Sequence, residues 1–186
     1  MRKYTLFFVV AAIIAALDLG SKEWVFDTLD RGDGRYGSIT VIDRVFEIVC
    51  HTNPGGMWSI GTDWNPWILK IVRLAAVCVI FVILQQTPKT DRLGVFALGL
   101  VMGGAVGNIH DSLRLHAVRD FLKFDFDFPP FDPFPIFNIA DSAICVGVAL
   151  LAIHGVPTGS AKGTHEGLSP PTPRQPCSTS ASARSN

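Results

Sequence analysis

Charge is scarce in this sequence, and neither sign is in excess. Only 17% of the 186 residues are charged, and 16 basic and 16 acidic side chains give a formal net charge of +0. Proteins that bind nucleic acid usually carry Lys and Arg clustered on one face. We therefore expect no nucleic-acid partner.

Patterns typical of metal sites and disulfide frameworks are also missing. The cysteines stand far apart, and none has the close spacing of a zinc site. The histidines form no HExxH pair of ligands. We therefore expect free thiols, no bound metal and no other cofactor. The cysteines are Cys50, Cys78, Cys145 and Cys177.

Apolar residues are abundant, at 48% of the chain. They gather in four segments, each close to the ~20 residues that a bilayer-spanning helix needs. We expect helices at about 4–24, 67–84, 93–111 and 136–154. The first segment alone resembles a signal peptide, but the three later segments favour a retained helix. The predicted fold class is therefore an all-α membrane protein with four transmembrane helices.

Basic residues beside these segments indicate their orientation. Arg2 and Lys3 precede the first segment, and the short link at 85–92 carries Lys89 and Arg92. Because positive charge favours the cytoplasmic side, we expect a multi-pass membrane protein with both termini in the cytoplasm. Two cations at the outer end of the second segment, at positions 70 and 73, count against this simple rule, although long basic side chains can snorkel to headgroups.

The loops 25–66 and 112–135 then lie outside the cytoplasm. Apolar and polar residues alternate at 39–42 and 46–49, which predicts short strands and a small β-sheet capping the helices. We expect residues 1–156 to form one membrane domain. The segment 157–186 is rich in Pro, Ser, Thr and Gly and is predicted to be a disordered cytoplasmic tail.

Acidic residues lie near the outer ends of three of the expected helices. Asp18 and Lys22 are four residues apart and share a helix face, and Asp111 ends the third helix. Asp120 follows in the outer loop, and Asp141 is placed about two turns into the fourth helix, within an apolar stretch. Because ionisable groups are costly in a membrane, a cluster at one depth predicts a functional site.

Two carboxyl groups at the end of apolar helices suggest acid–base catalysis. When they lie close together they tend to share one proton. The charged member can take a proton from water, while the protonated member donates to a carbonyl oxygen or a leaving amine. Peptide hydrolysis without a metal needs these two actions.

Five motifs, in order, resemble those of the lipoprotein signal peptidase (signal peptidase II) family. The third helix ends in the longest of them, which also holds small residues at Gly103 and Gly107. The resemblance covers roughly residues 5–155. The matching segments are Asp18-Leu19-Gly20-Ser21-Lys22, Asn53-Pro54-Gly55, Gly103-Gly104-Ala105-Val106-Gly107-Asn108-Ile109-His110-Asp111, Val118-Arg119-Asp120-Phe121 and Phe137-Asn138-Ile139-Ala140-Asp141-Ser142.

The resemblance implies an aspartic endopeptidase of the bacterial inner membrane, with Asp120 and Asp141 as the catalytic pair. The implied substrate is a prolipoprotein whose cysteine carries a diacylglyceryl group, cut just before that cysteine in contact with membrane lipids. The family further implies inhibition by the cyclic peptide globomycin, and we expect a monomer. The implied supporting and substrate-binding residues are Asp18, Lys22, Asn53, Gly55, Asn108, Asp111 and Asn138.

Three departures from the family pattern bear on substrate positioning. Ser112 stands where the family usually has Arg after the helix-three Asp, and Arg119 replaces a typically apolar residue. The outer loop reads Pro54-Gly55-Gly56-Met57-Trp58 where the family favours Gly-Ala-Ala-Phe. Neither aspartate of the pair is affected.

Two alternative functions stay open at this point. A catalytically silent relative would bind lipidated substrate without cutting it, and a cleavage assay separates it from a peptidase. A small proton-coupled transporter would also use membrane aspartates. Such a protein would have polar groups at the midplane of several helices, ideally in repeated halves, and the sequence has no visible repeat.

Overall fold

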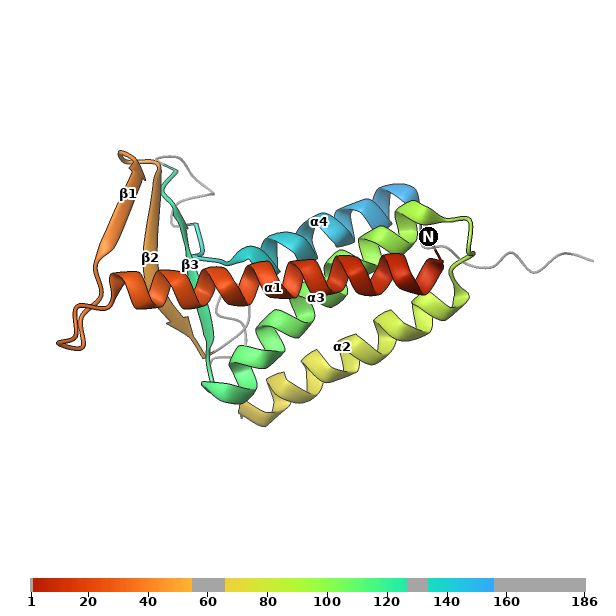
Figure 1. Cartoon of the computed structure of the whole chain (residues 1–186), viewed down its shortest axis with the longest axis horizontal. Helices are drawn as coiled ribbons and strands as arrows, with labels where there is room; N and C mark the ends of the chain where they lie inside the picture. Colours follow the sequence, from red (N-terminus) through yellow and green to blue (C-terminus); the bar gives the residue numbers. More distant parts are fainter. Residues whose placement is uncertain (1, 55–65, 127–133, 156–186) are drawn as a thin grey trace, which may run out of the picture.

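The computed structural model describes residues 2–54, 66–126 and 134–155. Within them, four helices and three strands follow in the order α1-β1-β2-α2-α3-β3-α4, and the sheet stands at one end of the helices (Figure 1). The helices are α1 (Lys3–Leu29), α2 (Pro66–Gln86), α3 (Arg92–Arg114) and α4 (Ile139–His154). The strands are β1 (Ser38–Ile42), β2 (Phe46–Asn53) and β3 (Val118–Phe124).

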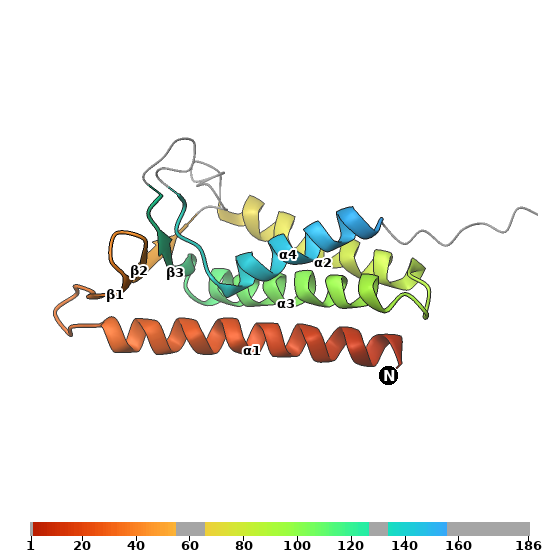
Figure 2. The same cartoon turned by 90° about the horizontal axis from the view of Figure 1, so that it is seen from above.

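Helix α3 is the centre of the helical part. It packs against α1, α2 and α4, and Figure 2 shows it between α1 and the other two. Its first turn is capped by Asp91, whose side chain accepts a hydrogen bond from the Gly94 amide at 2.9 Å. A cluster of buried side chains joins α1, α2 and α3, with Phe7, Leu84 and Leu98 at its centre.

Small residues allow α3 to approach its neighbours closely. A Cβ atom at Gly103 would lie 2.7 Å from the Ala11 carbonyl oxygen of α1, and one at Gly104 would collide with the Ala140 carbonyl oxygen of α4. Such glycines are typical of tight helix contacts in membranes. They bring the ends of α1, α3 and α4 together beside the sheet.

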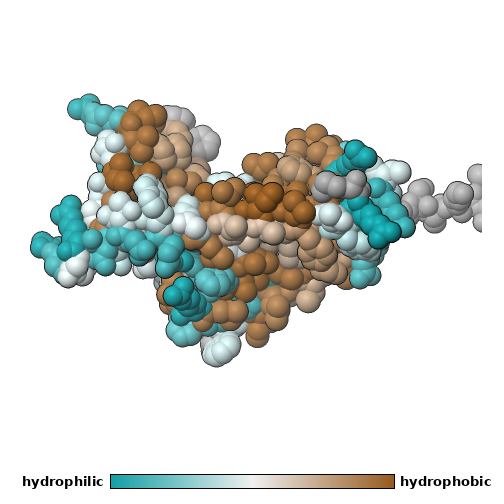
Figure 3. Space-filling view, in the orientation of Figure 1, coloured by the Kyte–Doolittle hydropathy of each residue, from teal (hydrophilic) through white to brown (hydrophobic). Residues whose placement is uncertain are grey.

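The helices expose many apolar side chains. Figure 3 shows a hydrophobic surface over the helices, with hydrophilic residues gathered towards the two ends. Ile71 and Leu74 of α2 and Val148 of α4 are all more than half exposed. Two described helices, α1 and α3, are long and apolar enough to cross a membrane, and α4 is apolar but has 16 residues. An apolar surface of this extent is expected where lipid replaces water.

The sheet is antiparallel, in the order β1-β2-β3. Its third strand was not expected, because residues 112–135 were predicted to be loop and the cap was assigned to 25–66 alone. The expectation failed because β3 is covered on both faces. Its first four residues are all buried, so the alternation that marks a half-exposed strand is absent.

Helices α1, α3 and α4 also differ from their expected limits, and α3 continues to Arg114 instead of ending at Asp111. Helix α1 continues to Leu29 instead of ending near residue 24, because Val25 and Leu29 are buried against Phe121 of β3. Helix α4 begins at Ile139 instead of residue 136, so Asp141 lies in its first turn and not two turns in. The differences in α1 and α4 bring these helix ends into direct contact with the sheet.

Candidate active site

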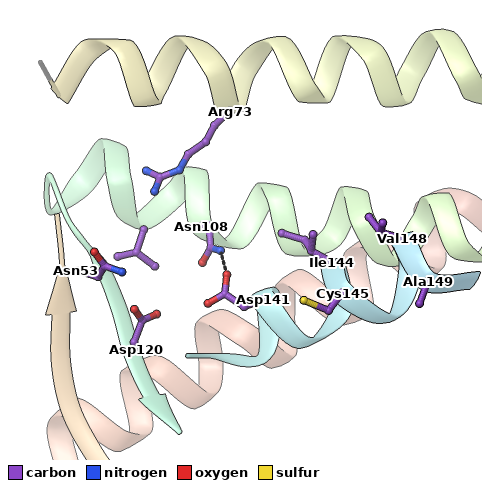
Figure 4. A pocket seen from close by; sticks show the side chains of 10 residues that line it. Asn53, Arg73, Asn108, Asp120, Asp141, Ile144, Cys145, Val148 and Ala149 are labelled. Atoms are coloured by element: carbon purple, nitrogen blue, oxygen red, sulfur yellow. Dashed lines mark hydrogen bonds between the residues drawn. The ribbon is translucent and has the colours of Figure 1, made fainter. Parts of the chain in front are cut away.

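A pocket of about 600 Å³ opens where the sheet meets α2, α3 and α4. We call it the central pocket. Figure 4 shows polar side chains gathered at the end nearest the sheet and apolar side chains of α4 along the rest. It is lined by Asn53, Arg73, Asn108, Val118, Asp120, Asp141, Ile144, Cys145, Val148 and Ala149.

Asp120 is brought to the pocket by β3, where it pairs with His51 of β2. Its side chain is almost wholly buried and accepts a hydrogen bond from the side-chain nitrogen of Asn138 at 2.6 Å. Burial, and then the nearby charge of Asp141, raise the pKa of Asp120 to about 7, although hydrogen bonds from Asn138 and Asn53 oppose this rise. Asp120 can therefore hold or release a proton near neutral pH.

Asp141 enters the same pocket from the first turn of α4. Asn138 caps this helix, because its side-chain oxygen accepts the Asp141 amide at 2.9 Å. The Asp141 carboxylate accepts a hydrogen bond from the Asn108 side chain at 2.8 Å (Figure 4). The two asparagines lie within 3.2 Å of each other. One continuous chain of hydrogen bonds therefore joins Asp120 to Asp141.

The backbone before α4 fixes Asn138 beside Asp120. Phe137 forms an isolated bridge with Leu122 of β3, and its carbonyl accepts the amides of Phe121 and Leu122 at 3.0 and 2.8 Å. The chain then turns directly into the helix. The short segment Phe137-Asn138 thus positions both Asp120 on β3 and Asp141 on α4.

A buried lysine lies beneath this pair. Lys22 of α1 is fully buried, and its ammonium group lies 2.7 Å from Asp18, 3.0 Å from the Asn108 side-chain oxygen and 3.5 Å from Asp111. The other oxygen of Asp18 accepts the backbone amide of Ala140 at 2.9 Å. A carboxylate from α1 therefore stabilises the N-terminus of α4.

Arg119 is the second buried cation, and its role could not be seen in the sequence. Its guanidinium binds both carboxylate oxygens of Asp111, at 2.9 and 3.2 Å, and contacts Glu23 at 2.8 Å. Such forked pairing restricts the orientation of both partners. Asp111 thereby ties the end of α3 to β3 and, among the described residues, does not line the central pocket.

Most residues singled out in the sequence therefore belong to one connected network. Asn53 lines the pocket beside Asp120, while Gly55 lies outside the described residues. Within the described part of the chain, no group of three His, Cys, Asp or Glu is placed to hold a metal ion. Cys50, Cys78 and Cys145 are free thiols, and Cys177 is outside the described part.

One pocket residue was misinterpreted in the sequence. Arg73 was expected to snorkel outward, but it points from α2 into the central pocket (Figure 4). The only available signal was a cation within an apolar segment, a position that usually marks function.

Comparison with known proteins identifies the family. A model of the family described as signal peptidase (SPase) II matches residues 10–156. The chain belongs to the signal peptidase II family. Signal peptidase II removes signal peptides from lipoproteins, and this activity is therefore assigned to the chain.

Two solved structures are similar to this signal peptidase II, and both are described as bacterial membrane enzymes. One, at 2.3 Å resolution, is 29% identical with a TM-score of 0.63, covering 85% of this chain and 92% of that chain. The other, at 1.9 Å resolution, is 26% identical with a TM-score of 0.66, covering 85% and 94%. The fold is thus shared over nearly the full length of both, and the chain is a bacterial membrane enzyme.

A close contact beneath the site supplies a first prediction. A Cβ atom at Gly107 of α3 would collide with the Asp18 carboxylate, which holds Lys22 and the start of α4. We expect Gly107→Ala to lower the free energy of unfolding by about 1–3 kcal/mol, as overpacking does, and to reduce cleavage. Thermal unfolding in detergent and a cleavage assay measure both effects.

Gly20→Ala is the matched control, because a Cβ atom there meets nothing within 4 Å. Alanine in a helix is favoured over glycine by about 0.5–1 kcal/mol, so this variant should be at least as stable as the parent. Parental stability and activity in Gly107→Ala would show that the close approach is unimportant.

Proposed function

We propose that this signal peptidase II is an aspartic endopeptidase whose catalytic residues are Asp120 and Asp141. The observation that carries the proposal is that two buried carboxyl groups, from a strand and a helix, line one pocket and are joined through Asn138 and Asn108. Two carboxyl groups so placed share one proton. Asn53 and Asn108 would orient the substrate, while Asp18, Lys22, Asp111 and Asn138 support the pair.

Hydrolysis then needs only water and the pair. The ionised carboxylate takes a proton from a water molecule as its oxygen attacks the scissile carbonyl carbon. The protonated carboxyl gives its proton to the carbonyl oxygen, which forms a tetrahedral diol. When the diol collapses, the C–N bond breaks and the carboxyl that took the proton from water gives it to the leaving amine. The other carboxylate takes a proton from a diol hydroxyl, so the pair again holds a single proton.

The apolar wall that α4 gives to the central pocket is consistent with a lipidated substrate. Ile144, Val148 and Ala149 of α4 continue from the acids along the helix, and Val148 is more than half exposed on the hydrophobic surface. A diacylglyceryl group on the cysteine can lie along this wall while the peptide reaches the aspartates. The substrate would be the diacylglyceryl-modified prolipoprotein, cut before the modified cysteine.

The distribution of charge supports the orientation in the membrane. Lys3, Lys89 and Arg92 line a small hollow. They belong to the start of α1, the link between α2 and α3 and the start of α3, which lie at the end of the helices opposite the sheet (Figure 1). Four helices crossing the inner membrane, with both termini in the cytoplasm, would place these cations inside and the sheet outside. The tail from 157 lies outside the described residues and is proposed to remain cytoplasmic. Globomycin is proposed to compete for the same pocket of a monomeric enzyme.

The position of the acids disfavours the transporter. A proton path needs groups distributed through the membrane, whereas Asp120 and Asp141 gather at the end of the helices nearest the sheet. The silent relative is separated from the peptidase by the assay described next.

Incubation of the purified protein with matched precursors tests the proposal. We expect diacylglyceryl-modified prolipoprotein to be cut on the order of a hundredfold faster than the unmodified form, because burying even four methylenes contributes about 3 kcal/mol. Mass spectrometry of the released signal peptide gives the cleaved bond. Equal rates for the two precursors would contradict the role of the apolar wall, and no cleavage of either would favour the silent relative.

A further inference from the structure

A third charged side chain reaches the central pocket beside the two acids. Arg73 extends from α2 towards the sheet end of the pocket (Figure 4), and its charge acts on both Asp141 and Asp120. It also borders a second, almost wholly apolar hollow of about 200 Å³ between α2 and α3. Arg73 therefore stands between the reacting groups and an apolar space open to lipid.

Ser112 of α3 holds this arginine in place. The Arg73 guanidinium donates a hydrogen bond to the Ser112 hydroxyl at 2.8 Å. Ser112 directly follows Asp111, at the position where the family pattern has Arg. The guanidinium of Arg73, from α2, is thus bound by the α3 residue that stands where the family pattern has Arg.

The charges around the site are closer to balance when Arg73 is included. Lys22 and Arg119 are engaged by Asp18 and Asp111, so these four groups sum to zero. Glu23 adds a half-exposed partner to Arg119 at the edge of the network. The catalytic pair with one proton adds a single negative charge in a poorly hydrated place. A buried charge without a partner is costly. The charge of Lys22 acts on both acids from α1, and Arg73 adds a second positive charge from α2.

We propose that Arg73 is a positioning residue of this peptidase, the counter-charge of the Asp120–Asp141 pair, delivered from α2 in place of the residue after Asp111. The proposal rests on the proposed aspartic mechanism. Arg73 stabilises the singly ionised pair, so the carboxylate that activates water is present at lower pH. The charged and titratable groups around the pair are Asp18 and Lys22 of α1, Arg73 of α2, Asp111 of α3, and Arg119 of β3, with His51 opposite Asp120 on β2.

The test compares pH profiles of kcat/KM with lipidated prolipoprotein. Without the cation, the first carboxyl of the pair ionises less readily, so the acidic limb moves to higher pH. We expect Arg73→Gln to shift this limb by about one pH unit, the effect of losing one nearby opposite charge. Arg73→Lys, which keeps the charge, should leave the limb near its parental position. A purely structural role for Arg73 would lower activity without moving the limb.

An arginine placed on α3 should compensate for the loss of Arg73. The double variant Arg73→Gln/Ser112→Arg restores one cation beside the pair, and we expect its acidic limb to return towards the parental position. It also tests the proposal if Arg73→Gln fails to fold, since failure to restore the limb in a folded double variant would overturn the inference. Lys70→Gln is the control, because Lys70 lies one turn earlier on α2 against His116 and Trp67. Its profile should match the parent.

The outcomes separate this inference from the proposed function. A parental acidic limb in folded Arg73→Gln, with cleavage still dependent on Asp120 and Asp141, overturns the role of Arg73 alone. Loss of that aspartate dependence in the parent enzyme overturns the mechanism and the inference together.

Discussion

We expect Asp120→Asn and Asp141→Asn each to reduce the rate of cleavage of lipidated prolipoprotein by at least about a thousandfold. Asn keeps the size and hydrogen bonding of Asp but cannot take a proton from water or return one, and such acid–base steps contribute about 10²–10⁴-fold. The double variant should be little slower than either single one, because the two groups act as a unit. Single-turnover rates of signal-peptide release measure all three variants.

Measuring the thermal stability of the same variants tests whether unfolding causes their loss of activity. Asp120 has a folded pKa of about 7, above its ordinary value of 3.8. The carboxyl therefore favours the folded state most at low pH, and this contribution is lost as pH rises from about 4 to about 7. Asp120→Asn should be at least as resistant to heat as the parent above pH 7. A folded Asp120→Asn or Asp141→Asn enzyme with near-parental rates, stopped by EDTA, would contradict the assignment.

The proposed sharing of one proton by Asp120 and Asp141 predicts how the activity of the parent enzyme depends on pH. Activity should fall on the alkaline side as the last proton leaves the pair, in the region of the Asp120 pKa of about 7. It should fall again on the acidic side when both carboxyls are protonated, so the profile is bell-shaped. Asp111→Asn provides the contrast, since we expect partial loss with the bell retained.

Lys22→Met is expected to have the largest effect on stability. Lys22 is fully buried between Asp18 and Asp111. Its removal leaves two buried carboxylates with less compensation, and breaking a buried pair in this way costs about 3–5 kcal/mol. Thermal unfolding in detergent should show a large drop, with loss of cleavage because Lys22 also holds Asn108.

Lys123→Met is the matched control for this change. Lys123 contacts Glu47 and Asp125 at 3.1 and 3.0 Å, but it lies on the sheet surface and is about one-third exposed. Surface pairs contribute at most about 1 kcal/mol, so this variant should stay close to the parent. Combining Asp18→Asn with Lys22→Met should recover part of the lost stability, and an equal loss in both lysine variants would contradict the buried network.

The helices and most of the acidic residues could be predicted from the sequence. Long apolar runs mark helices because a membrane leaves the backbone few other ways to satisfy its hydrogen bonds. The acids were detectable because charge within such runs is rare. Asn138 also carried a local signal, since an Asn three residues before Asp141 is a common helix start.

The sheet and the partners of the acids could not be predicted in the same way. Strand β3 pairs with β2 across a long stretch of chain, and neither segment contains information about which partner it meets. Arg119 and Arg73 each looked like a departure from an apolar pattern. Their roles depend on Asp111 and Ser112, which only the folded chain brings near.

The division of the proposed catalytic pair between β3 and α4 has a consequence for biosynthesis. Asp120 and Asp141 meet only after Asn138 has turned the chain from the β3 bridge into the last described helix. A ribosome that has released α1, α2 and α3 has therefore made most of the scaffold before the two acids can meet. The proposed active site is therefore completed late in synthesis, by the last described helix.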